Sequence, residues 1–415
     1  MTTSLPFKRK IINDPLYGFI TIADKLVFDV IEHSFFQRLR RIEQLGLASM
    51  VYPGALHTRF HHALGAMHLM GQAIETLRSK GFHISNEEAQ GAILAILLHD
   101  IGHGPFSHAL EHQIVHCISH EEITLMFMKY LNAEFGGKLD MAISIFENSY
   151  PRKFLHQLVS GQLDMDRLDY LMRDSFYTGV NEGVISTDRI LKMLTVLDDE
   201  LAVELKGIYS IEKFIVARRL MYWQVYYHKT VLSVEYMLVS ILNRARVLLA
   251  ESKELPASKA LRFFLSQQIG KEQFDSSPEI LATFAALDDY DIHSAIKEWS
   301  SNPDPVLSLL CTSLLNRKLF RVIISNTPFA PEKIEKIRNN ITGKLKLKID
   351  EYKFLSGLGE ISNSAYDPNN DRITMVDKND QRWDISGLSE QLNIAIYNKT
   401  VSKYFIYYPK WAEDN

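Results

Sequence analysis

Apolar residues recur every three or four positions through most of the first three hundred residues, which is the spacing of one helix face. The pattern predicts helices over 26–46, over 59–80 between Thr58 and Gly81, and over a segment that ends near residue 100. Ser85, with Glu88 three residues later, forms a capping-box pattern that marks the start of this third helix. These segments predict a mainly α protein.

Strand-like patterns come later in the chain. Residues 195–207 read as a hairpin, and a long helix is expected over 211–249. From about residue 319 the chain mixes helices with three strand-like segments, 320–325, 372–377 and 404–409, and the polar turn 367–371. We therefore expect a helical core over 1–310 and a smaller α+β C-terminal subdomain over 311–415.

Composition narrows the setting. The net charge of -4 does not favour nucleic-acid binding, although it does not exclude it. Two cysteines cannot make a disulfide framework, and neither a signal-peptide core nor a membrane-length apolar run is found. We expect a protein of a reducing compartment, most simply the cytoplasm.

Histidines are concentrated in one part of the chain, because eleven of the fifteen fall between His57 and His120. Histidine binds divalent metals well and titrates near neutral pH, so such a cluster indicates metal or acid–base chemistry. His99 and Asp100 come at the end of an apolar predicted helix, in the stretch "LLHDIGHGPFSH".

A metal site can be assembled from residue types alone. His62 lies on the preceding predicted helix and Asp166 in the dense motif "QLDMDRLDYLMRD", so that two imidazoles and two carboxylates come from three segments with His99 and Asp100. This donor set suits iron, manganese, cobalt, nickel, zinc or magnesium, and the sequence does not choose among them. A closed structural zinc site is disfavoured because no cysteine is near.

The motifs resemble a known family. The chain is similar to the HD-domain phosphohydrolases, most closely to the branch of the SAM-and-HD-domain deoxynucleotide triphosphohydrolase and its bacterial relatives. The resemblance is carried, in the family's order, by "NDPLYG" (13–18), "FQRLRRIEQLG" (36–46), "YPGALHTRFHHALG" (52–65), "HDIGHGPFSH" (99–108), "MDRLDYLMRD" (165–174) and "YHK" (227–229).

The resemblance implies an HD motif region over 50–180 and roles for individual residues. The family's metal ligands fall on His62, His99, Asp100 and Asp166, the set already reached from residue types. Residues at the triphosphate correspond to His103, His108 and His120, with Glu111 in place of a family aspartate. His108 is the expected general acid, assisted by His120 and Glu111, and His120 as the acid is the alternative. The implied substrate contacts are Arg59, Arg167 and Arg218 at phosphates, Tyr170 and Asp174 at phosphate and the 3′-hydroxyl, Tyr226 at the base, and Gln44 and Leu45 at the sugar.

These roles imply a metal-dependent deoxynucleoside triphosphate triphosphohydrolase. Leu45 against the sugar 2′ position would exclude ribonucleotides. The alternatives are another HD-type nucleotide phosphohydrolase or phosphodiesterase, a non-catalytic nucleotide-sensing subunit, and a nuclease or single-stranded nucleic-acid binder. Three arginines disfavour a monophosphate substrate.

Regulation follows from the resemblance only in outline. Relatives are often oligomers activated by nucleotides at subunit interfaces, and Lys229, Arg40 and Gln37 lie where relatives place such interfaces. The chain departs from the best-known relative at two positions: Tyr227 replaces a glutamine, and His61 replaces a glutamate. These differences leave the preferred base and the identity of the activator open. A homo-oligomer, a dimer or a tetramer, with deoxynucleoside triphosphates as substrates and activators, is the expectation.

Overall fold

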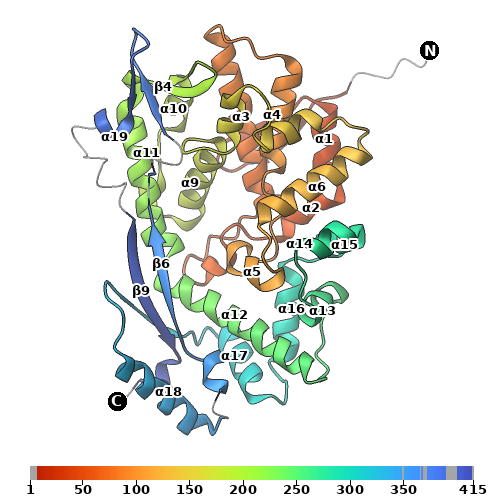
Figure 1. Cartoon of the computed structure of the whole chain (residues 1–415), viewed down its shortest axis with the longest axis vertical. Helices are drawn as coiled ribbons and strands as arrows, with labels where there is room; N and C mark the ends of the chain where they lie inside the picture. The colour runs from red at the N-terminus through yellow and green to blue at the C-terminus, as the bar shows by residue number, and fades with distance from the viewer. Residues whose placement is uncertain (1–6, 348–349, 365, 368–371, 389–399, 414–415) are drawn as a thin grey trace.

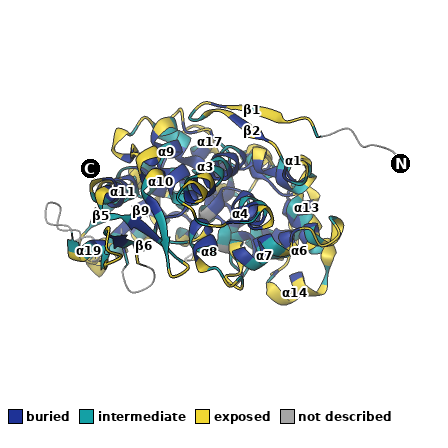
Figure 2. Cartoon of the chain, turned by 90° about the horizontal axis from the view of Figure 1, so that it is seen from above, coloured by how far each residue is buried: buried dark blue, intermediate teal, exposed yellow. Residues whose placement is uncertain are grey.

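The computed structural model describes residues 7–347, 350–364, 366–367, 372–388 and 400–413, apart from the side chains of His108 and His112. Three helices form the centre of the larger, helical part: α3 (Arg59–Ser79), α4 (Asn86–Leu98) and α9 (Met165–Thr178). Helix α3 packs against both others, and most of its residues are buried. Figure 1 shows these helices in the upper half of the molecule, and in Figure 2 buried residues surround them.

The predicted helix starts are confirmed. Ser85 accepts a hydrogen bond from the backbone N–H of Glu88, whose side chain accepts from the Ser85 N–H, so both halves of the capping box form. Thr58 caps α3 in the same way with His61. Helix α4 ends at Leu98, so that His99 and Asp100 lie in the turn after it. Polar ligands therefore follow directly after a buried helix.

The prediction of one helix over 26–46 is wrong. The chain instead forms α1 (Lys25–Glu32), α2 (Ser34–Gln37) and a 3-10 turn, Arg38–Arg41. His33 has an extended backbone, and its Nδ1 accepts a hydrogen bond from the N–H of Phe35. This cap competes with helix continuation and ends α1.

The predicted helix over 211–249 is also divided. Helix α11 (Ile208–Met221) passes into a wider π turn, η6 (Tyr222–Tyr226), and α12 (Lys229–Ala250) begins after the extended His228. The Tyr227 N–H donates to the Tyr222 carbonyl at 2.8 Å, five residues back. Such π turns are frequent at functional sites.

The remaining helices surround this centre. They are α5 (Glu111–Ile114), α6 (His120–Glu134), α7 (Asp140–Phe146), α8 (Lys153–Val159), α10 (Thr187–Met193), α13 (Lys259–Ser266), α14 (Lys271–Ser276), α15 (Pro278–Ala285), α16 (Asp289–Trp299), α17 (Pro305–Leu315), α18 (Pro331–Leu345) and α19 (Ile385–Leu388). None of the helices in the described part of the chain is long and apolar enough to span a bilayer.

Three small sheets complete the fold. An N-terminal hairpin, β1 (Lys10–Asp14) and β2 (Gly18–Ile22), lies on one edge with many exposed residues (Figure 2). The predicted hairpin at 195–207 forms as β3 (Leu194–Leu197) and β4 (Glu200–Glu204). Strand β7 (Thr374–Val376) pairs in parallel with β4 and antiparallel with β8 (Arg382–Asp384). The third sheet has the order β5 (Arg321–Ser325), β9 (Val401–Tyr408), β6 (Gly357–Asn363).

The C-terminal region thus has the predicted α+β character, and each predicted strand segment contains a strand. Its strand β7 extends the β3–β4 hairpin of the helical part, so the sheet joins segments about 170 residues apart in the chain. The predicted polar turn at 367–371 lies almost wholly outside the described residues. Residue 310, the expected boundary, lies within α17, and the division into two domains there stays a prediction.

Candidate metal and phosphate site

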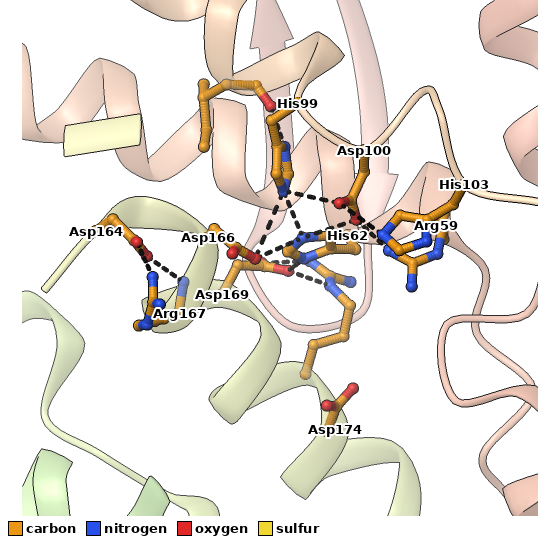
Figure 3. A network of polar contacts seen from close by, with 12 residues as sticks. Arg59, His62, His99, Asp100, His103, Asp164, Asp166, Arg167, Asp169 and Asp174 are labelled. Atoms are coloured by element: carbon orange, nitrogen blue, oxygen red, sulfur yellow. Dashed lines mark hydrogen bonds and ion pairs between the residues drawn. The ribbon is translucent and has the colours of Figure 1, made fainter. Parts of the chain in front are cut away.

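Three predicted metal ligands converge from three segments. Nε2 of His62 in α3 lies 3.3 Å from Nε2 of His99, after α4, and 3.1 Å from Oδ1 of Asp166 in α9. His99 Nε2 and Asp166 Oδ1 are 3.5 Å apart. Asp100 completes the set, with Oδ1 3.4 Å from His99 Nε2. Figure 3 shows these four side chains pointing toward one another.

Neighbouring groups fix which nitrogen of each ring faces the site. Nδ1 of His62 lies 2.8 Å from Asp169 Oδ2, and Nδ1 of His99 lies 2.6 Å from the Ile96 carbonyl oxygen. Both Nδ1 atoms therefore donate to acceptors, which leaves the two Nε2 lone pairs directed at one shared position. Metal-binding histidines have this arrangement in general.

The electrostatics of this position favour a cation. Burial lowers the pKa of His62, but hydrogen bonds to Asp166 and Asp169 outweigh it and raise the pKa to about 10. Positive charge is thus stabilised at this point, whether a proton or a metal ion carries it. The donor atoms of His62, His99 and Asp166 lie close enough together to hold one divalent metal ion. Asp100 lies beside this group and also belongs to a second possible group with His103 and His120.

A buried chain of ion pairs, which the sequence did not predict, lies behind the proposed ligands. Asp169 accepts two hydrogen bonds from Arg173, at 2.9 and 3.0 Å, and Arg173 donates to Asp14 at 2.8 Å. All three side chains are almost fully inaccessible. Asp169 and Arg173 lie in the same motif as Asp166, at helix spacing, and Asp14 lies in "NDPLYG". The sequence signal for this chain of ion pairs was the series of charged residues in a helix whose other buried residues are apolar.

Arg59 reaches the site from the first turn of α3. Its guanidinium pairs with Asp100 and donates to Ser107 Oγ at 2.8 Å. Burial raises the pKa of a carboxyl, but Arg59 outweighs it and holds the pKa of Asp100 well below its ordinary value. Asp100 is therefore ionised, and it contacts the metal position and the guanidinium together.

The predicted acid–base residues lie beside Asp100. The rings of His103 and His120 stack with centroids 3.9 Å apart, and His120 Nδ1 lies 2.6 Å from Glu111 Oε1. Burial and the charge of Arg59 hold the pKa of His103 well below its ordinary value, so this ring is neutral near pH 7. The prediction for the His108 side chain lies outside what the structure describes.

One cavity of about 550 Å³ joins these groups to the predicted substrate residues. Its wall includes Gln44, Leu45, Arg59, Asp100, His103, His120, Asp166, Arg167, Tyr170, Asp174, Arg218 and Tyr226. His62, His99 and Glu111 are absent from this wall, because they lie behind Asp100, Asp166 and His120 as their partners. The structure therefore brings every predicted site residue whose side chain it describes into one connected region.

Two of the arginines in the wall are also held by neighbours. Arg167 pairs with Asp164, the N-cap of α9, as Figure 3 shows, and Arg218 donates to Gln162 at 3.0 Å. The Nε atoms of both arginines are buried and have no acceptor among the described residues. Both arginines belong to the cavity wall.

Asp174, near the end of α9, contacts a residue that the predictions omitted, His57, which lies just before α3. Both oxygens of Asp174 are occupied, one 2.8 Å from His57 Nε2 and one accepting from the Tyr226 hydroxyl at 2.8 Å. The His57 ring stacks on Tyr177 at 4.5 Å. His57 thus holds Asp174 in place, and the only sequence signal for it was its membership of the histidine cluster.

The residues expected near an interface lie apart from the cavity wall. Arg40 stacks on Phe60 at 3.5 Å and donates to Gln37, and Lys229 is exposed at the start of α12. Tyr227, in contrast, lines the cavity, and its hydroxyl donates to the Ser362 carbonyl at 2.8 Å.

Comparison with known proteins agrees with this geometry. The HD-domain family model matches residues 59–170, and the HD associated region matches 185–263. The crystal structure of a phosphohydrolase from Bacteroides thetaiotaomicron is 52% identical and covers 97% of this chain and 100% of its own, with a TM-score of 0.94. The uncharacterized protein YwfO of Bacillus subtilis is 30% identical over 97% of this chain and 93% of its own length.

A named triphosphohydrolase is more distant. The deoxynucleoside triphosphate triphosphohydrolase SAMHD1 homolog of Dictyostelium discoideum is 29% identical over 65% of this chain and 56% of its own length. The two matched family regions contain all four metal-ligand positions and both halves of the divided helix, α11 and the start of α12. The chain belongs to the HD-domain phosphohydrolases, which are metal-dependent enzymes, and is related to the SAMHD1-type branch.

Proposed function

We propose that the protein is a deoxynucleoside triphosphate triphosphohydrolase, which converts a deoxynucleoside triphosphate and water to a deoxynucleoside and inorganic triphosphate. The observation that supports this most is the composition of one cavity wall. It combines the carboxylates Asp100 and Asp166 with three arginines, Arg59, Arg167 and Arg218. A triphosphate carries more negative charge than a monophosphate or a cyclic nucleotide, and three guanidinium groups suit it.

The four ligands His62, His99, Asp100 and Asp166 would hold the metal ion. When bound, this ion would polarise the α-phosphoryl group and lower the pKa of water at that position. Arg59 would keep Asp100 ionised and contact phosphate with its remaining donors. Arg167 and Arg218, in the same cavity wall, would bind the outer phosphates.

Water then attacks the α-phosphorus, and the bond between this phosphorus and O5′ breaks. The leaving O5′ takes a proton from a histidine. We assign this proton to His120 or to His108: His103 is neutral and buried, whereas His120 is oriented by Glu111. Glu111 also offsets the positive charge that a protonated His120 carries.

The other wall residues would select the sugar. We expect Leu45 to occupy the space beside C2′ and Gln44 to bind the sugar, because both stand at the start of the η2 turn (Gly46–Met50) in the cavity wall. Tyr170 and Asp174 would contact the 3′-hydroxyl, and Tyr226 would flank the base. A ribose 2′-hydroxyl would then clash with Leu45.

A product assay tests the proposal. The purified protein, loaded in turn with Mn²⁺, Co²⁺, Ni²⁺, Fe²⁺, Zn²⁺ or Mg²⁺, is incubated with each of the four deoxynucleoside triphosphates, alone and in pairs, and products are separated by ion exchange. The unmodified protein is expected to release triphosphate. The Asp166→Ala variant should release none, although it should still bind nucleotide. Absence of triphosphate under every condition would refute the proposal, and nucleotide binding without turnover in the unmodified protein would indicate a sensor.

A further inference from the structure

His57 lies behind the cavity wall, and no step of the proposed reaction uses it. Its side chain is fully inaccessible to solvent, and its ring stacks on Tyr177 with the two planes 16° apart. The His57 carbonyl accepts the backbone N–H of Gln44 at 2.9 Å, and Nε2 of the ring lies 2.8 Å from Asp174 Oδ1. One buried residue therefore contacts two residues of the cavity wall that come from different segments.

The contacts of the His57 ring fix which nitrogen carries the proton. Nε2 faces the Asp174 carboxylate and donates to it. Nδ1 is buried and no described residue bonds to it, so a proton on Nδ1 would have no acceptor. Turning the ring would break the bond to Asp174 and leave a buried carboxylate short of a donor, which costs free energy.

Asp174 meets uncharged donors on both of its oxygens. Oδ1 accepts from His57 and Oδ2 from the Tyr226 hydroxyl, each at 2.8 Å, and the residue is almost fully buried. Within the described part of the chain, no arginine or lysine pairs with Asp174. Each carboxylate oxygen can accept more than one hydrogen bond, so Asp174 can accept a further donor from the cavity that it lines.

A second acceptor lies in the same wall. Oε1 of Gln44 is buried, and none of the described residues donates to it. Because His57 contacts both Gln44 and Asp174, the two acceptors stand on either side of one fixed residue. An anion would be repelled by the carboxylate, whereas a neutral hydroxyl group would find acceptors for its proton. This part of the wall therefore suits a hydroxyl donor of the ligand.

The spacing along α9 separates this part of the wall from the metal ligands. Asp174 lies eight residues after Asp166, on the same helix, which is about 12 Å along the helix axis (Figure 3). A nucleotide whose α-phosphate lies at the metal ligands would extend its sugar in this direction. The sugar of a deoxynucleoside 5′-triphosphate has one hydroxyl group that can donate, the 3′-hydroxyl.

We propose that His57 is a positioning residue that holds Asp174 in the orientation that accepts the 3′-hydroxyl, so that the site discriminates a deoxynucleotide from its 2′,3′-dideoxy counterpart. This inference rests on the proposed function, because it concerns the sugar of the same triphosphate substrate. His57 acts only through the Asp174 carboxylate. It does not contact the substrate and takes part in no covalent step.

The test compares each deoxynucleoside triphosphate with its 2′,3′-dideoxy counterpart, which lacks only the 3′-hydroxyl, on the Mn²⁺-loaded protein. The ratio of the two kcat/KM values should be about 10- to 100-fold in the unmodified protein, the usual effect of a hydrogen bond to a charged group. Both substrates are measured on one preparation. A loss of folded protein lowers both rates equally and leaves the ratio unchanged.

Three variants of His57 separate its donor from its bulk. His57→Phe keeps a ring on Tyr177 without a donor, and His57→Asn holds its amide too close to the backbone to reach Asp174. Both should lower the ratio by about 10-fold, because the deoxynucleotide alone loses a hydrogen bond. His57→Gln, whose amide nitrogen reaches the position of Nε2, should restore most of the ratio. His68→Phe, whose ring lies against Tyr17 and outside the cavity wall, is the matched control and should leave the ratio unchanged.

The outcomes separate this inference from the proposed function. A ratio near one in the unmodified protein, an unchanged ratio in His57→Phe and His57→Asn, or a ratio in His57→Gln as low as in His57→Asn would overturn the role of His57 while triphosphate release continued. The Gln and Asn variants differ by one methylene and decide the role even if His57→Phe fails to fold. Failure to release triphosphate from any deoxynucleotide would refute the proposed function instead.

Discussion

Asp169 lies behind the proposed metal ligands and contacts two partners, His62 and Arg173, at once. It accepts from His62 Nδ1 at 2.8 Å and twice from Arg173, and all three side chains are buried. In Asp169→Asn an amide replaces the carboxylate. This change removes one negative charge from the chain of ion pairs and holds the His62 ring less firmly in its orientation. Metal affinity is expected to fall by about 10- to 100-fold, as for other partners of metal-binding histidines.

Metal content after dialysis against buffered Mn²⁺ measures this effect. Asp188→Asn, an exposed aspartate in α10, is the control and should bind metal like the unmodified protein. Equal metal affinity in Asp169→Asn and the control would contradict the role of the ion-pair chain.

Glu43 and Asp289 form a buried acidic pair next to the loop that holds His103. Asp289 accepts from the N–H groups of Phe106 and Glu43, at 2.7 and 2.8 Å. Burial raises the pKa of both carboxyls to about 7. Since the unfolded chain ionises near pH 4, the folded state binds more protons between about pH 4 and pH 7, and this contribution to stability is lost as the pH rises.

Glu43→Gln removes one of these titrating groups. Between pH 5 and pH 8 the melting temperature of the variant should decrease less than that of the unmodified protein. Identical changes in both proteins, measured by circular dichroism, would mean that Glu43 does not ionise in this window.

Residue types alone predicted the proposed metal ligands, since His62, His99, Asp100 and Asp166 stand in motifs rich in ionisable groups. The ion-pair chain through Asp169 was not identified, because it depends on which face of α9 meets α3. That choice is made by packing between helices distant in sequence.

The sequence predicted helices and hairpins correctly where residues close together in the chain determine them. The capping box at Ser85 and the β3–β4 hairpin formed as expected, since both depend on neighbours within a few residues. The breaks at His33 and His228 were not expected, because each is a histidine that caps the following turn through Nδ1. Histidine is not among the usual capping residues, so sequence patterns do not mark such breaks.

The close contact between α3 and α9 depends on one glycine. A Cβ at Gly65 would lie 2.0 Å from Asp169 Oδ1 and 2.2 Å from an Arg173 nitrogen, whereas a Cβ at Gly71, in the same helix, would contact nothing within 4 Å. Gly65→Ala should therefore destabilise by roughly 1–3 kcal/mol or more through overpacking. Gly71→Ala should instead stabilise by up to about 1 kcal/mol through helix propensity.

Urea unfolding of the two variants provides an internal comparison within one helix. Equal stabilities would show that α3 and α9 can separate without cost, and would contradict the tight packing behind the metal site.

At the scale of the whole molecule, distant segments are combined in ways that local patterns do not determine. Strand β7 pairs with β4, and Tyr227 of the divided helix donates to Ser362 in β6, at the edge of the cavity. The C-terminal region therefore supports the cavity wall at Tyr227. Its strands were predicted, but their partners were not, because strand pairing over such distances has no signal in a single sequence.

Assembly is a further prediction at this scale. Arg40, Gln37 and Lys229 lie apart from the cavity wall, where family resemblance places subunit interfaces, and we expect a dimer or a tetramer. Light scattering after size exclusion, with and without mixed deoxynucleoside triphosphates, should give a mass of two or four chains, with nucleotides favouring the larger form. A single-chain mass under both conditions would contradict the expectation.

In the proposed reaction, water attacks the α-phosphorus at the His–Asp site. Hydrolysis of dGTP in H₂¹⁸O, followed by mass spectrometry of the products, tests it most directly. The expected products are unlabelled deoxyguanosine and inorganic triphosphate with one ¹⁸O atom. Label in the deoxynucleoside, or deoxynucleoside monophosphate with pyrophosphate as the products, would contradict it.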